Sequence, residues 1–105
     1  MSKAQIERIK KMESYLDEAG AAFSELAEAL DKYEKIQNKY YKLENYYSST
    51  KWIDDFEADE AGKLPADLKR GVLSEDAVYD LITNHSALMA RLQRAVLRSI
   101  EKKEF

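Results

Sequence analysis

Residues 9–33 read IKKMESYLDEAGAAFSELAEALDKY, and the apolar side chains in this stretch recur at alternating steps of three and four residues. Such a stripe faces a partner helix along a coiled coil, while glutamate and lysine at the positions between suit a solvated face. The pattern therefore predicts a long amphipathic helix with a coiled-coil stripe. The stripe consists of Ile9, Met12, Leu16, Ala19, Phe23, Leu26, Leu30 and Tyr33.

The predicted helix extends beyond the stripe, from about residue 2 to residue 47. After Tyr33 the apolar positions step by three residues to Ile36 and then continue to Tyr47, a change that slightly overwinds a coiled coil. Gly20 is the only glycine or proline in this range. A glycine inside a helix costs about 1 kcal/mol relative to alanine, so the sequence leaves open whether the helix bends there.

Residues 48–73 differ in composition and form the predicted connector. They contain the only tryptophan, the only proline and two of the three glycines. Ser49 or Thr50 is expected to cap a short helix over residues 52–59, since serine and threonine accept hydrogen bonds from the first free amides of a helix. Gly62 and Pro65 are expected to stop that helix.

A last helix is predicted from about residue 75 to residue 103. Ser74 precedes two acidic residues, which favour the positive end of a helix, and Leu73 and Val78 have the spacing of a hydrophobic staple. Two long amphipathic helices and a connector give an all-α fold: a long antiparallel helical hairpin or small three-helix bundle with a short central helix and an irregular connector. The length predicts a single domain over residues 1–105.

Composition excludes several classes of partner and chemistry. The chain has 105 residues, is 45% hydrophobic and 35% charged, and carries a net charge of −3. An acidic balance argues against nucleic acid as the main partner. The absence of cysteine removes disulfides and thiolate metal sites. No segment resembles a signal peptide or a membrane span. We therefore expect a cytoplasmic location and no membrane partner.

The run YYSSTKWIDDFEADEAGKLPADLKRGVLSEDAVYDLI, which begins at Tyr46, resembles the signature of the DUF4298 family, small bacterial and phage-associated proteins of unknown function. The earlier stretch ERIKKMESYLDEA resembles the opening of the same family, and the resemblance covers about residues 6–92. It implies a small all-helical protein. It supplies no activity, substrate or cofactor.

The acidic cluster, residues 54–60, places five carboxylates in seven residues. An EF-hand loop starting at Asp55 would need glycine and glutamate where Glu60 and Ala66 stand, so the calcium motif fails. Asp55 and Asp59 share a helix face at a spacing of four residues and could hold Mg²⁺ or Mn²⁺ weakly. A solvated helix surface is the simpler interpretation, and no metal, cofactor or catalytic residue is predicted.

Aromatic and basic side chains supply the other candidates. Trp52 and Phe56 are expected to anchor the connector in the core, whereas Tyr41 and Tyr46 lie off the apolar stripe and are expected to be exposed. Lys69 and Arg70 are expected to pair with the acidic cluster, and His85, on the apolar stripe of the last helix, to be a core residue.

The sequence therefore favours a non-enzymatic module that binds another protein. The unmatched length of the first helix adds a homodimer as an option, because a second copy would cover its exposed stripe. A small metal-dependent or ligand-dependent protein or enzyme that uses the acidic cluster is an alternative. The family resemblance adds a further one, a phage-type inhibitor of a host or defence protein. The candidate interaction residues are Tyr41, Tyr46, Trp52, Asp55, Asp59, Lys69 and Arg70.

Overall fold

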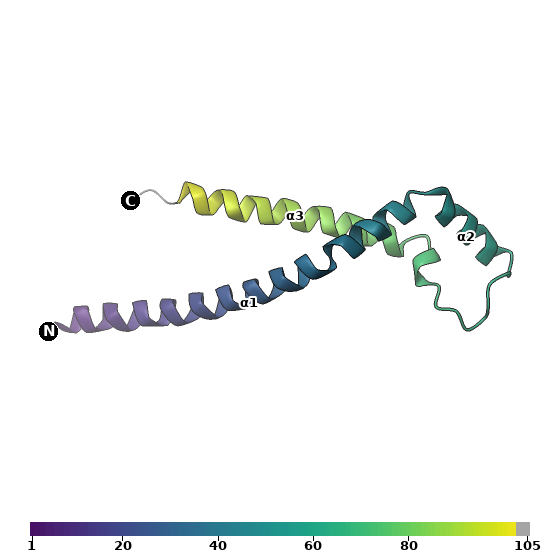
Figure 1. Ribbon diagram of the computed structural model, residues 1–105. Helices are drawn as coiled ribbons and strands as arrows, with labels where there is room; N and C mark the ends of the chain where they lie inside the picture. The colour runs from purple at the N-terminus through teal and green to yellow at the C-terminus, as the bar shows by residue number, and fades with distance from the viewer. Residues whose placement is uncertain (103–105) are drawn as a thin grey trace. The chain divides into compact units, whose positions relative to one another are not determined.

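The structure, a computed structural model that describes residues 1–102, contains three α-helices and one short 3₁₀-helix (Figure 1). The described residues form no strand, so the predicted all-α fold is confirmed. The expected helix end at Lys103 lies outside the described residues. The elements are α1 (Lys3–Tyr47), α2 (Thr50–Glu60), the 3₁₀-helix η1 (Gly71–Leu73) and α3 (Ala77–Glu101).

Helix α1 has 45 residues and is continuous through Gly20. Its start is capped by Ser2, whose Oγ accepts a hydrogen bond from the Gln5 amide at 3.1 Å. A serine followed three residues later by glutamine is the sequence pattern of a capping box, so the sequence itself marks the start of the helix. Gly20 does not interrupt the helix.

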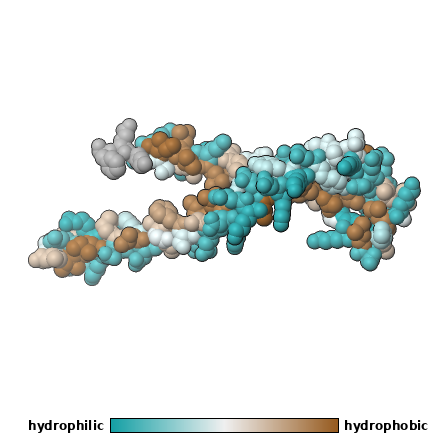
Figure 2. All heavy atoms as spheres, in the orientation of Figure 1, coloured by the Kyte–Doolittle hydropathy of each residue, from teal (hydrophilic) through white to brown (hydrophobic). Residues whose placement is uncertain are grey.

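The chain divides into two compact units, and the first, Met1–Lys39, consists of a single helix. A helix alone cannot bury one of its own faces. Six large apolar side chains of the stripe in this unit are accordingly 46% to 70% exposed, whereas that of Tyr33 is half-buried. Figure 2 shows apolar atoms on the surface along this part of α1. These side chains are Ile9, Met12, Leu16, Phe23, Leu26 and Leu30.

The second unit begins at Tyr40 and contains the buried residues of the described chain. Tyr40, Leu73 and Val78 are 7%, 6% and 3% exposed, and they belong to α1, η1 and α3 respectively. The Tyr40 ring lies 4.3 Å from the His85 ring, so the last turns of α1 contact α3. The connector packs on α3 through η1, which also contacts α2.

Helix α2 ends in a Schellman motif. Gly62 has a φ of +69°, a left-handed conformation that glycine adopts without steric cost. Its amide donates to the Asp59 carbonyl, and the Lys63 amide donates to the Ala58 carbonyl, each at 3.0 Å. The predicted stop at Gly62 is therefore confirmed.

The predicted serine cap at the start of α2 is wrong, because the Ser49 hydroxyl donates a hydrogen bond to the preceding Tyr46 carbonyl at 2.6 Å.

Ser74 does cap the start of α3, although the regular helix begins at Ala77. Its hydroxyl oxygen accepts a hydrogen bond from the Ala77 amide at 3.2 Å and donates to the Gly71 carbonyl at 2.9 Å. The side chain thus joins η1 to α3 through both of its hydrogen-bonding roles. Leu73 and Val78, the predicted staple pair, are both buried.

Candidate functional site

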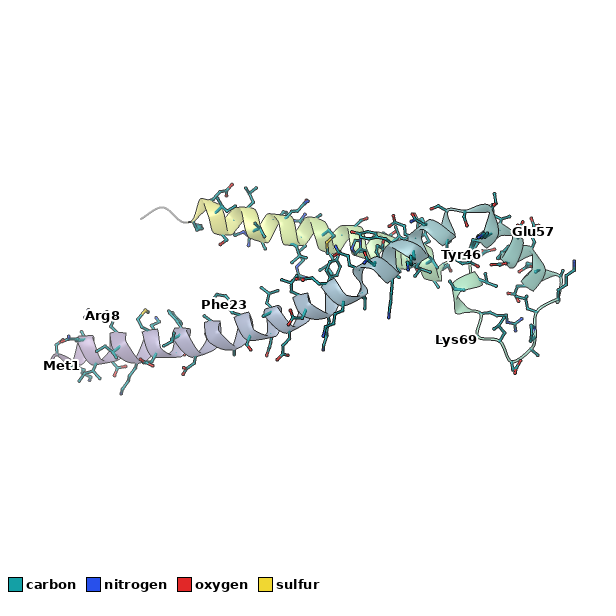
Figure 3. The ribbon with its side chains drawn as sticks, viewed as in Figure 1. Met1, Arg8, Phe23, Tyr46, Glu57 and Lys69 are labelled. Atoms are coloured by element: carbon teal, nitrogen blue, oxygen red, sulfur yellow. The ribbon has the colours of Figure 1, made fainter. Side chains whose placement is uncertain are left out.

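The seven residues that the sequence nominates all lie in the second unit. They come from the last turns of α1, from α2 and from the segment that joins α2 to η1. Figure 3 shows Tyr46 at the end of α1 and Lys69 in that joining segment. The structure therefore brings the candidates into one part of the chain, and the contacts among them decide which ones are available to a partner.

Trp52 ties α2 to η1. Its indole Nε1 donates a hydrogen bond to the Val72 carbonyl at 2.9 Å, across 20 residues of chain. The ring stacks on Phe56, one helical turn later, with centroids 5.2 Å apart, and meets the edge of Tyr47 at 5.0 Å. Such aromatic pairs add about 0.5 to 1.5 kcal/mol beyond the area that they bury. Trp52 and Phe56 are half-buried anchors of the connector, as the sequence predicts.

Tyr46 joins α1 to α2. Its hydroxyl donates a hydrogen bond to a carboxylate oxygen of Asp55 at 2.6 Å. Partial burial, followed by the hydrogen bond and the negative charge of Asp55, raises the pKa of Tyr46 to about 12, so the neutral phenol is favoured. The expectation that Tyr46 is freely exposed is wrong, because the side chain is half-buried and holds Asp55.

Arg70 and Asp59 form the predicted ion pair between the basic segment and the acidic cluster. The Arg70 Nη1 and Asp59 Oδ1 atoms lie 2.7 Å apart, with 37% and 24% of the two side chains exposed. A pair with this much solvent contact contributes only about 0 to 1 kcal/mol. It nonetheless fixes the joining segment against the end of α2, while the neighbouring Lys69 is exposed.

Three of the nominated residues remain on the surface: Tyr41, Asp55 and Lys69. Tyr41 is 43% exposed, and its ring lies 5.5 Å from the ring of Tyr40. Asp55 is exposed but already accepts the Tyr46 hydrogen bond. Tyr41 and Lys69 therefore offer the most accessible side chains of the predicted set.

Sequence reasoning missed three exposed apolar side chains of the connector. Ile53, Leu68 and Val72 are 50%, 49% and 37% exposed. A signal for Ile53 was present: Trp52 and Phe56 are four residues apart and pack on one face of α2, and Ile53 points about 100° away from Trp52 and about 60° away from Phe56. No comparable periodicity exists around Leu68, because it lies in irregular chain.

Two of the five carboxylates in the acidic cluster make contacts within the chain. Asp55 accepts from Tyr46 and Asp59 pairs with Arg70, and these are the two carboxylates that the weak metal alternative requires. Over residues 1–102, no three histidine, cysteine, aspartate or glutamate side chains are grouped so that they could hold a metal ion. A cation held by Asp55 and Asp59 would compete with these structural contacts of the connector.

His85 lies on α3 and is half-buried against Tyr40. Its ring is tilted by 35° from the tyrosine ring at a centroid distance of 4.3 Å. This placement supports the predicted core role.

Within the described part of the chain, no helix is both long enough and apolar enough to cross a bilayer.

A family model for a domain of unknown function, DUF4298, matches residues 9–94. The chain belongs to the DUF4298 family. The match begins at the first residue of the α1 stripe and includes every nominated residue of the connector, so the DUF4298 unit comprises both features. No curated protein and no solved structure matches the chain.

Proposed function

We propose that this DUF4298 chain is a non-enzymatic protein–protein interaction module whose connector presents a binding surface to another protein. We define the connector surface as four exposed side chains: Tyr41 near the end of α1, and Ile53, Leu68 and Lys69 of the connector itself. Self-association through the α1 stripe is the second part of the proposal.

The observation that carries the proposal is that one group of side chains fixes the shape of the connector while another group is exposed to solvent. Trp52, Tyr46 and Arg70 each make a hydrogen bond to another segment, at 2.9, 2.6 and 2.7 Å, and so fix the shape of an otherwise irregular chain. The large side chains of the connector surface make none of these hydrogen bonds and are exposed to solvent. A preorganised segment loses less conformational entropy when it binds, and exposed apolar and aromatic side chains are the usual anchors of protein interfaces.

The chemistry of the titratable groups also favours binding over catalysis. Asp55 and Asp59 have structural partners, and the raised pKa of Tyr46 keeps its phenol protonated across the neutral range. A nucleophile or general base needs an available proton-accepting form near the working pH. These groups instead serve the shape of the connector.

A quantitative pull-down tests the connector surface. The bait is the full chain, and the source is a lysate of the organism's cytoplasm, the compartment that we propose. The surface variant carries Tyr41→Ala, Ile53→Ser and Lys69→Glu, none of which removes a fixing hydrogen bond. The matched control carries Thr83→Ala and Asn84→Ala, two exposed positions on α3. Both variants must have the thermal midpoint of the parent.

We expect one partner to be enriched by the parent and the control and reduced at least tenfold by the surface variant. Equal capture by all three baits would overturn the role of the connector surface. No enriched partner in any of the three would overturn the proposal that the connector binds a cellular protein.

A further inference from the structure

We draw no further inference here: the strongest candidate, the exposed apolar face of α3 around Leu92, Val96 and Ile100, carries none because nothing in the structure shows what covers it.

Discussion

The two units of the chain use their apolar side chains in opposite ways. In Met1–Lys39 a regular stripe lies on one helix, and six of its large side chains are 46% to 70% exposed. In the second unit a less regular sequence buries Tyr40, Leu73 and Val78 and makes hydrogen bonds between separate segments. Regular periodicity thus provides a surface that needs a partner, whereas aromatic residues and turns allow a short segment to pack on its own chain.

The comparison implies that the two units respond separately to substitution. Damage to the connector should leave the helix of the first unit intact, and damage to the stripe should leave the connector folded. The predictions below test that separation.

Trp52→Ala should have the largest effect, because it removes the Val72 hydrogen bond and both aromatic contacts. We expect the free energy of opening the connector to fall by about 2 to 3 kcal/mol, less than for a fully buried tryptophan. Hydrogen exchange by mass spectrometry measures this by segment: amides of α2 should lose protection, and those of residues 3–39 should not. Ile53→Ala, at an exposed neighbour, is the control and should change the opening free energy by less than about 0.5 kcal/mol. Equal loss of protection across both units would contradict their independence.

Leu16→Lys should show the reverse behaviour. The side chain is 66% exposed in the single chain, so charging it should cost little within the monomer but disrupt a seam between copies. We expect self-association at least tenfold weaker by sedimentation equilibrium, with connector exchange unchanged. Ser14→Lys introduces the same residue on the polar side of α1 as a control. If both substitutions weaken association equally, charge rather than the stripe governs it.

Tyr46→Phe should destabilise the connector by about 1 kcal/mol at neutral pH, the usual contribution of one hydrogen bond. The effect has a pH signature. The folded pKa of about 12 lies above the ordinary value of 10.0, so the contribution of the protonated phenol is complete below pH 10 and is lost as the pH rises through 12. Ultraviolet titration should show one fewer late-ionising tyrosine in Tyr46→Phe than in the parent. An unchanged late component in the variant would assign it to another tyrosine.

Arg70→Ala should have the smallest effect, between about 0 and 1 kcal/mol, because the ion pair with Asp59 is partly solvated. A double-mutant cycle with Asp59→Ala, followed by hydrogen exchange of residues 61–70, isolates the coupling. The coupling should shrink as salt is added, since exposed charges are screened. A coupling above 2 kcal/mol would mean that the pair is far better shielded than its exposure indicates.

Local signals predicted the helices well. The expected first helix, residues 2–47, differs from α1 by one residue, because a capping serine and an unbroken periodic stretch define it. Gly62 marked the end of α2 through its turn chemistry, and Ser74 marked the start of α3 through its capping hydroxyl.

Contacts across irregular chain were predicted less well. The pairing of Arg70 with Asp59 followed from charge, but the Trp52 bond to Val72 depends on the path of the intervening segment, which no periodicity describes. Tyr46 was expected on the surface because it lies off the stripe of α1, and only the position of α2 brings Asp55 to its hydroxyl. The candidate site was therefore predictable in its location and not in which residues are exposed.

The indole of Trp52 is the only one in the chain and is held between Phe56 and the Val72 carbonyl. Its fluorescence therefore reports the connector alone, whereas circular dichroism is dominated by the two long helices. Partner binding at the connector and self-association through the α1 stripe would thus produce optically separate signals in the native, unlabelled protein.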